Sequence, residues 1–391
     1  MFHFDLIIPC YGESKLINRG LSSLATQWKS EYIHVTLVND CSPNTDCDYQ
    51  DLVDKYKDEI DIRVIKTPKN VGQGLARQFG IDNTRRDWFM FMDEDDQIAT
   101  GIAISQIVGA AEGYYLDIDE NGMVPLDKNG KPRKRKGIPK LALVSPPLFE
   151  FDDNHTHVIS ANNQIWLNGK LYNRKFVEKH NVRFNEAQSR HAEDYFWGTC
   201  LFHCLNNDKE YAAILLDDKQ LFYLWYPNEQ SQSRSDPNYG FMLSGYTMGG
   251  SVNILRFIKN NKTVKFTKEV KEQYKQRVLD MTVYSFFTFL SFIRRVASSD
   301  YVPAEEEHWT LLRDACYRLK EECKLYFDEY DYMRVVEQLH NCKNHSDVHY
   351  TEPWITFEDY IRNGMKEHHW SYKTLLECRY KFDKEGRRVW D

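Results

Sequence analysis

The first hundred residues alternate between short apolar runs and helical stretches, and this alternation constrains the fold more than any other feature of the chain. The apolar runs cover residues 4–9, 34–40, 61–67 and 87–93. The helical stretches lie between them, at residues 14–27, 49–59 and 72–83. Strands that alternate with helices of this length form βαβ units, in which a mainly parallel sheet is covered on both faces. The sequence therefore predicts an α/β domain at this end of the chain.

Polar side chains gather where these apolar runs end. Tyr11 and Glu13 follow the first run, Asp40 ends the second, and residues 93–96 follow the fourth. Ligands of open parallel sheets bind beyond the carboxyl ends of the strands. We therefore expect the functional site at this edge of the sheet.

The strongest chemical signal is the acidic run from Asp93 to Asp96, which follows the apolar segment WFMFM. Four adjacent carboxylates repel one another, and a bound divalent cation relieves that repulsion. Carboxylate oxygens suit Mg²⁺ or Mn²⁺, which bind through one or two carboxylates and the phosphates of a substrate. The alternative is an acidic loop that caps a helix beginning near Ile98.

Two other motifs have both a functional and a purely structural interpretation. Asp40, in LVNDCSPN, either contacts a ligand or forms an Asx-turn with the residues that follow it. The segment NVGQGLARQFGI, residues 70–81, places two glycines before a helix whose amides can accept a phosphate. It is equally consistent with an ordinary loop and helix start, and the P-loop pattern GxxxxGK[ST] is absent.

Residues 114–140 interrupt the α/β pattern with two Asn-Gly pairs, which predict an inserted β-ribbon or a mobile loop. Five cations cluster there, namely Lys131, Arg133, Lys134, Arg135 and Lys136. The run is either a solvated hairpin tip or a contact for a polyanion: teichoic acid, an anionic lipid surface, or DNA carrying hydroxylated bases. If it binds an acceptor, substituting these five residues weakens that binding and flattens its salt dependence.

The spacing of the apolar residues changes beyond about residue 245. From Phe266 to Arg294, apolar residues recur at steps of three and four, which is typical of one face of a long helix. The sequence predicts an α/β domain over residues 1–245 and an all-α region over residues 246–391. This helical region could bind the acceptor, form a homo-oligomer or support the sheet, and the sequence does not choose among these.

Composition excludes several classes of protein. The net charge of −7 excludes a basic body that binds nucleic acid non-specifically. The nine cysteines form no CxxC pair, so free thiols in a reducing compartment are expected. The N-terminal residues do not have the pattern of a signal peptide, and no apolar run reaches the length of about 20 residues that spans a bilayer. These features predict a cytoplasmic protein with no transmembrane segment.

Taken together and in order, several motifs resemble those of the inverting family-2 glycosyltransferases with the GT-A fold. The motifs are IIPCYGE, VNDCSPN, NVGQGLARQFGI, FMDEDD, NGKLYNRKFVEKHNVRFNE and AEDYFW. The resemblance covers about residues 3–235 and leaves the helical region outside. It implies a Rossmann-like GT-A catalytic domain that uses a nucleotide-diphosphate sugar, with UDP as the expected nucleotide.

The resemblance also implies roles for individual residues on the donor side. Pro9, Tyr11 and Glu13 would line the pocket of the base, and Asp40 would accept a hydrogen bond from uracil. Asp95 would ligate Mn²⁺ or Mg²⁺ at the diphosphate. The remaining donor-site residues would be Asp93 at the ribose or metal-bound water, Arg77 at the base or phosphates, Lys170 near the donor sugar, and Ser233 and Arg234 in a loop over the diphosphate. Family members often have Ala, Gly or Ser between the two motif aspartates, where this chain has Glu94.

The Glu193-Asp194 pair is the expected catalytic element. An acceptor hydroxyl is a poor nucleophile and needs a general base within hydrogen-bond reach. The resemblance assigns this role to Asp194, with Glu193 orienting it or binding the acceptor. The apolar residues that follow Asp194 would raise its pKa and make it a better base. The alternative is that both carboxylates only cap a helix.

The sequence thus predicts a metal-dependent hexosyl- or N-acetylhexosaminyl-transferase that works by single displacement with inversion. The QxxRW motif of processive synthases is absent, so transfer is expected to be non-processive. Two alternatives remain. A nucleotidyltransferase also combines an α/β fold with carboxylate-bound metal, but the N-terminal triphosphate loop of such enzymes is missing. A non-catalytic module that binds a sugar nucleotide or a glycan is the other.

Overall fold

In the computed structural model, the described residues are 2–12, 14–43, 49–99, 101–151, 156–160, 166–216, 221–226 and 239–274, together with 310, 381–382 and 388–389. The chain divides into two compact units. The first contains residues 1–228 and 261–264, and the second contains residues 229–260 and 265–391.

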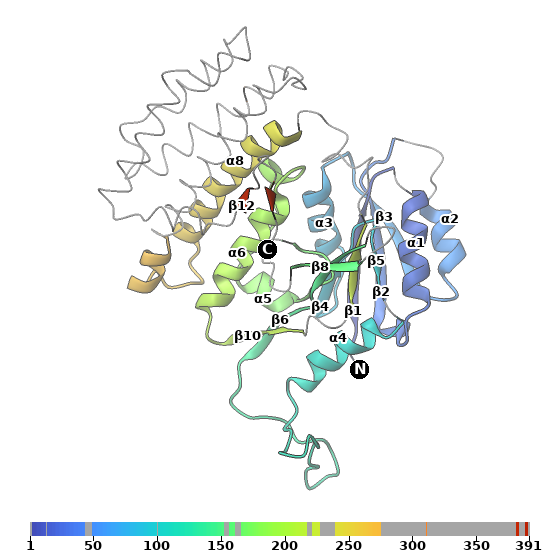
Figure 1. Ribbon diagram of the computed structural model, residues 1–391, viewed down its shortest axis with the longest axis vertical. Helices are drawn as coiled ribbons and strands as arrows, with labels where there is room; N and C mark the ends of the chain where they lie inside the picture. Colours follow the sequence, from blue (N-terminus) through green and yellow to red (C-terminus); the bar gives the residue numbers. More distant parts are fainter. Residues whose placement is uncertain are drawn as a thin grey trace. The chain divides into compact units, whose positions relative to one another are not determined.

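The first unit is built on a seven-stranded sheet with the order β10-β6-β9-β4-β1-β2-β3 (Figure 1). The strands are β1 (Phe4–Cys10), β2 (Ile33–Asn39), β3 (Asp61–Lys66), β4 (Trp88–Phe91), β6 (Lys140–Ser145), β9 (Leu171–Asn173) and β10 (Tyr211–Leu215). β1 runs parallel to β2 and β4, β2 to β3, and β6 to β10. Only β9 runs antiparallel to its neighbours β4 and β6. The predicted mainly parallel sheet is confirmed.

Helices cover both faces of this sheet, as Figure 1 shows. They are α1 (Ser14–Ala25), α2 (Tyr49–Tyr56), α3 (Gln73–Asp82), α4 (Ala103–Gly113), α5 (Arg174–Lys179) and α6 (Glu193–Asn207), with short 3₁₀ turns at Ser30–Tyr32 and Glu186–Gln188. Side chains of β1 alternate between the two faces. Leu6 and Ile8 belong to the core that also contains Ile17 of α1, whereas Ile7 lies against Gly80 of α3. Burial on both faces explains why the strands read as continuous apolar runs.

A second sheet lies next to the acidic run and has the order β5-β11-β7-β8. Its strands are β5 (Gln97–Ile98), β11 (Tyr223–Trp225), β7 (Leu148–Phe151) and β8 (Thr156–Ser160). One of the two interpretations of the acidic run placed a helix start near Ile98. The structure has the strand β5 at that position, and α4 begins only at Ala103. The interpretation of the acidic run as a helix cap is therefore wrong.

Residues 114–140 leave the sheet between α4 and β6 and form a projecting ribbon (Figure 1). Bridges join Leu116 to Lys134 and Leu126 to Pro132. The ribbon that the Asn-Gly pairs predict is thus present.

The second unit is described mainly through α8 (Tyr239–Asn260), which runs across the predicted boundary at residue 245. A two-stranded ladder of β12 (Lys381–Phe382) and β13 (Arg388–Val389) lies in the region expected to be helical. Most residues that would test the predicted domain division and the homo-oligomer lie outside the described ranges, so both stay predictions. Over the part of the chain that is described, no helix combines the length and apolarity that crossing a membrane requires.

Candidate functional site

The parallel strands bring the predicted polar residues to one edge of the sheet. Cys10 ends β1, Asn39 ends β2 and Phe91 ends β4. The register pairs Cys10 with Asn39 and Ile7 with Phe91, so the three strands end at the same edge of the sheet. Tyr11 follows β1, and the acidic run follows β4. The amide of Met92 donates to the carbonyl of Ile7 at 3.2 Å and so fixes the start of the acidic run on β1.

The centre of the site is Arg77, a buried arginine on α3. Its Nη2 donates to Oδ1 of Asp93 at 2.6 Å, and its Nη1 donates to Oε1 of Glu193 at 2.8 Å. Burial opposes the charge of Arg77, but the two carboxylates outweigh this effect and raise the pKa of the guanidinium above its ordinary value. One cation therefore joins the acidic loop after β4 to the start of α6.

Both oxygens of Asp93 accept hydrogen bonds from neighbouring side chains. Besides Arg77, Nε2 of Gln73 donates to Oδ1 at 3.1 Å and Nδ2 of Asn168 donates to Oδ2 at 2.6 Å. The amide of Asp93 donates to the hydroxyl of Tyr223 at 3.1 Å. Asp93 is thus held from α3, from the segment before β9 and from β11.

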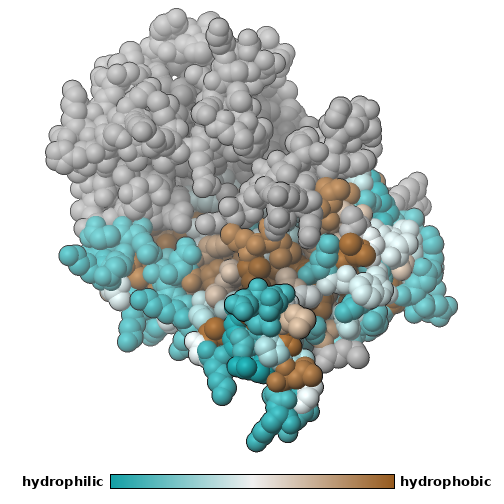
Figure 2. All heavy atoms as spheres, turned by 60° about the horizontal axis from the view of Figure 1, so that its bottom comes forward, coloured by the Kyte–Doolittle hydropathy of each residue, from teal (hydrophilic) through white to brown (hydrophobic). Residues whose placement is uncertain are grey.

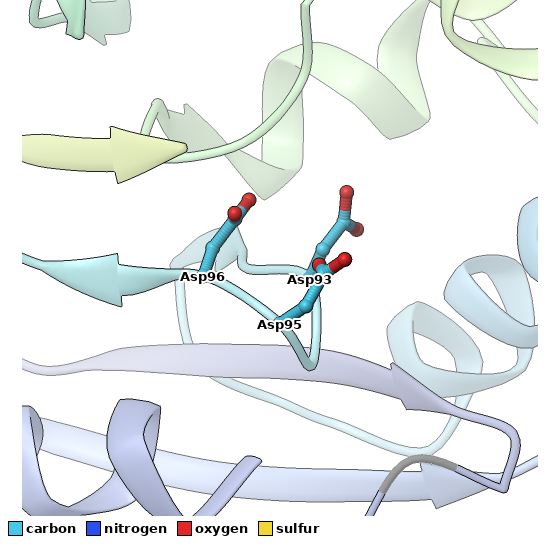
Figure 3. Close-up of side chains that lie close together, drawn as sticks. All are labelled: Asp93, Asp95 and Asp96. Atoms are coloured by element: carbon cyan, nitrogen blue, oxygen red, sulfur yellow. The ribbon is translucent and has the colours of Figure 1, made fainter. Parts of the chain in front are cut away.

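Asp93, Asp95 and Asp96 form a carboxylate cluster, in which one oxygen of each lies within 4.8 Å of those of the others (Figure 3). Asp96 is fully buried and accepts from the hydroxyl of Tyr223 at 2.6 Å and from the amide of Tyr226 at 3.0 Å. Burial, followed by the charges of Asp93 and Asp95, raises the pKa of Asp96 well above its ordinary range. Three hard oxygen donors at this spacing fit Mg²⁺ or Mn²⁺, whose charge offsets the repulsion within the cluster.

Glu94, within the same run, faces a different part of the site. Its carboxylate accepts from the amide of Tyr11 at 3.1 and 3.3 Å and from the hydroxyl of Tyr49 at 3.4 Å. It therefore fixes the loop after β1. The carboxylate that replaces the small residue of the family pattern is thus engaged with this loop, and it is not a member of the carboxylate cluster.

Asp194 lies in the first turn of α6 and is half-buried. Its Oδ1 accepts from the amide of Tyr195 at 2.7 Å. Burial and the charge of Glu193 raise the pKa of Asp194 to about 7. The preceding Ala192 has a φ of 57°, a left-handed conformation that costs about 1 kcal/mol or more for a residue with a Cβ. This backbone turn starts α6 directly at the two acidic residues.

Lys170, which directly precedes β9, lies within electrostatic reach of Asp194. It is buried, and burial lowers its pKa to about 7, while Asp194 opposes this shift. Its ammonium lies 5.5 Å from the ring centre of Phe202. The negative charge of Asp194 thus favours the protonated form of Lys170.

Asp40 has a clear structural role. It is buried, and its Oδ1 accepts from the amide of Val71 at 2.8 Å and from the hydroxyl of Thr67 at 2.9 Å. Its Oδ2 accepts from the amide of Gly72 at 2.8 Å. The predicted Asx-turn of Asp40 with the residues that follow it is wrong, because the amide of Ser42 donates to Oδ1 of Asn39 at 2.9 Å, and the donors to Asp40 come from the loop that enters α3. The expected hydrogen bond from uracil would have to share these oxygens.

The two glycines of the loop before α3 serve close packing. Gly72 has a φ of +86°, and a Cβ there would lie 2.8 Å from the carbonyl oxygen of Ser189. A Cβ on Gly74 would lie 2.9 Å from Cβ of Glu193. Their amides donate to Asp40 and to the carbonyl of Ser189, so they are not available to a phosphate. The glycines allow α3 to pack closely against residues 189–193. This packing brings Arg77 within hydrogen-bond distance of Glu193.

Of the remaining predicted donor-site residues, some lie within the described residues and others lie outside them. Pro9 is buried in β1, and Tyr11 is 47% exposed at the end of that strand. Glu13, Ser233 and Arg234 lie outside the described residues. The structure thus brings Arg77, Asp93 and Glu193 into direct contact, and places Asp95 and Asp194 next to members of this network.

Sequence patterns did not identify two residues that hold the acidic loop. Asn168 donates to Asp93, and its own Oδ1 is buried without a hydrogen-bond partner. The pair Asn168-Gly169 before Lys170 was the available signal, because Gly169 has a φ of +73° and a Cβ there would lie 2.8 Å from the ring of Tyr223. Tyr223 gave no signal, since an aromatic residue in a strand is typical of a core.

Comparisons with known proteins find similarity to glycosyltransferases. Residues 5–181 match the family model described as glycosyl transferase family 2. The chain is 28% identical over 191 residues to the succinoglycan biosynthesis protein ExoO of Rhizobium meliloti (strain 1021), covering 48% of this chain and 52% of that protein. It is 25% identical over 238 residues to the processive diacylglycerol beta-glycosyltransferase of Mycoplasma pneumoniae (strain ATCC 29342 / M129 / Subtype 1), covering 59% and 66%. The chain spans about half the length of the first relative and about two thirds of the second.

Solved structures give the same fold. The crystal structure of S. aureus TarS 1-349 in complex with UDP-GlcNAc is 15% identical with a TM-score of 0.56, covering 100% of this chain and 97% of that one. The structure of S. aureus TarS 1-349 gives a TM-score of 0.54 at 15% identity, covering 93% and 92%. Residues 5–181 therefore resemble glycosyl transferase family 2, and the fold of the chain is the GT-A fold.

Proposed function

We propose that this chain transfers a hexosyl or N-acetylhexosaminyl group from a UDP-sugar to an acceptor hydroxyl by single displacement with inversion. The observation that carries the proposal is the Asp93–Arg77–Glu193 network, because it joins the carboxylate cluster to the segment that holds Asp194. The complex of S. aureus TarS with UDP-GlcNAc supports UDP as the nucleotide.

The carboxylate cluster is the proposed holder of a divalent cation. Asp95 is its principal ligand, with Asp93 as a second one. Bound there, Mn²⁺ or Mg²⁺ supplies charge that neutralises the leaving diphosphate. Arg77 and Asn168 fix the orientation of Asp93, which makes them positioning residues for this site.

Asp194 is the proposed general base. The acceptor oxygen forms a bond to the anomeric carbon while the bond from that carbon to the diphosphate oxygen breaks, so UDP leaves with the electron pair. The acceptor proton passes to Asp194, whose pKa of about 7 allows it to accept a proton at neutral pH. One base without a nucleophile on the other side of the sugar gives inversion, and the product dissociates after each transfer.

Product analysis tests the proposal directly. The full-length chain is incubated with UDP-, GDP- and dTDP-sugars in the presence and absence of Mn²⁺ or Mg²⁺, and nucleotide and pyrophosphate release are measured. Metal-dependent release of UDP is expected. Release of pyrophosphate would instead indicate a nucleotidyltransferase, and donor binding without release of either product would indicate a non-catalytic binding module.

A further inference from the structure

The ribbon of residues 114–140 is an ordered projection, although most of its side chains are exposed. Backbone amides of Asp117 and Arg135 donate at 2.9 Å to the carbonyls of Arg133 and Tyr115, which ties the two sides of the ribbon together. At its base, the hydroxyl of Tyr115 accepts from the amide of Leu141 at 2.8 Å. The ribbon therefore presents its side chains from a defined backbone.

The ribbon is basic within an acidic chain. It contains seven Lys or Arg residues and four Asp or Glu residues, whereas the whole chain has a net charge of −7. Three of the four acids have local partners. Asp119 and Asp127 accept from nearby backbone amides, and Asp117 forms an ion pair with Arg133 at 3.0 Å. Lys131, Lys134 and Lys136 are exposed and have no ion-pair partner within the described residues. The surplus positive charge therefore faces outward.

The ribbon also carries exposed apolar side chains. Ile118 is 47% exposed, Met123 66% and Leu126 62%. Figure 2, which brings the lower side of Figure 1 forward, shows hydrophilic and hydrophobic side chains next to one another on this face. A soluble polyanion is bound by cations and gains little from apolar groups, whereas a lipid surface offers headgroup phosphates together with an apolar layer beneath them.

We propose that residues 114–140 dock this chain on the surface of an anionic lipid bilayer. Lys131, Arg133, Lys134, Arg135 and Lys136 contact the lipid phosphates. Ile118, Met123 and Leu126 enter the boundary between the headgroups and the acyl chains. The proposal is independent of sugar transfer, because it requires neither a donor nor the carboxylate cluster.

The test measures co-sedimentation of the full-length chain with vesicles of phosphatidylcholine alone and of phosphatidylcholine mixed with phosphatidylglycerol. At least about tenfold tighter binding to the mixed vesicles is expected, and added salt weakens it through screening. Replacing the five cations by Gln is expected to weaken binding to the mixed vesicles by at least about tenfold. The reason is that each cation near an anionic surface contributes about fivefold to the partition coefficient. A control carries five Gln substitutions at exposed lysines elsewhere: Lys57, Lys175, Lys209, Lys262 and Lys265. The control binds like the unmodified chain.

A second variant separates a lipid surface from a soluble polyanion. Met123→Ser with Leu126→Ser keeps every charge, so it weakens vesicle binding at least about threefold while binding to soluble polyphosphate stays unchanged. Its control replaces two exposed apolar residues elsewhere, Leu215 and Phe266, by Ser. Equal binding to both vesicle types, or a Gln variant that still binds the mixed vesicles fully, would overturn the proposal. So would unchanged vesicle binding by the Met123/Leu126 variant, which would identify a general polyanion site.

Discussion

Nη1 of Arg77 lies 2.8 Å from Oε1 of Glu193, although 116 residues separate the two along the chain. The same guanidinium donates to Asp93, so the acidic loop after β4 and the start of α6 share one buried cation. This arrangement makes the two halves of the site interdependent.

Arg77→Met removes the cation that pairs two buried carboxylates. Breaking a buried pair from one side costs about 3–5 kcal/mol, because the remaining charges lose their partner. We expect a loss of this order in the free energy of unfolding, measured by urea denaturation, together with loss of transfer. The control is Arg183→Met, which breaks an ion pair with Asp82 whose side chains are 52% and 44% exposed. That change costs at most about 1 kcal/mol, and an equal cost for both variants would contradict the role given to Arg77.

Gly74→Ala tests the packing that carries Arg77 to its partners. The added Cβ would lie 2.9 Å from Cβ of Glu193, so the variant is expected to lose about 1–3 kcal/mol of stability and part of its activity. Gly109→Ala is the matched control, because Gly109 lies inside α4 and a Cβ there meets nothing within 4 Å. Because Ala has a higher helix propensity than Gly, Gly109→Ala is expected to raise the free energy of unfolding by about 0.5–1 kcal/mol. Thermal unfolding curves of both variants check the opposite signs.

Asp95→Asn tests the cation site. Removal of a ligand carboxylate is expected to weaken Mn²⁺ binding, measured by calorimetry in the presence of UDP, by at least about tenfold. Glu94→Gln removes the same charge one residue away, but Glu94 faces Tyr11 and Tyr49. Its Mn²⁺ affinity should therefore change by no more than about threefold. If Glu94→Gln were the more damaging variant, the ligand assignment would be wrong.

Asp194→Asn tests the base. General-base catalysis contributes about 10²–10⁴-fold, so kcat for transfer should fall by at least about 100-fold while the Kd for the donor stays within about threefold. Glu186→Gln, an exposed carboxylate shortly before α6, serves as the control and keeps normal kinetics. Normal turnover by Asp194→Asn would show that another group accepts the proton.

The pH profile gives an independent test of the same residue. Asp194 must be deprotonated to act as a base, and its pKa is raised to about 7, so kcat/KM should rise between about pH 5 and pH 7. The negative charge of Glu193 contributes to this raised pKa. Glu193→Gln removes that charge and should move the rising limb to lower pH. A limb that stays in place in this variant would indicate that a different group titrates.

Much of the fold could be predicted because it depends on local patterns. Buried parallel strands read as apolar runs between helical stretches, and the polar residues that follow β1, β2 and β4 meet at one edge for topological reasons. The positions of the acidic run and of the Glu193-Asp194 pair followed from that rule together with the family resemblance.

The partners of individual side chains could not be predicted, because they depend on how distant elements pack. The sequence suggested that Arg77 contacts a base or a phosphate, whereas its Nη atoms donate to Asp93 and Glu193 once α3 packs against residues 189–193. The glycines near Arg77 suggested phosphate binding, whereas their amides donate to Asp40 and to the carbonyl of Ser189 once these elements pack together. The direction of Glu94 was equally unpredictable, since it depends on the loop after β1.

The most direct test of the central claim is a crystal structure of the full-length chain with UDP and Mn²⁺. We predict that Mn²⁺ binds a carboxylate oxygen of Asp95 at about 2.1 Å and also contacts the diphosphate, with Asp194 facing the open sugar position in the same cavity. Mn²⁺ and UDP bound away from the carboxylate cluster, or Asp194 facing a separate surface, would contradict the account.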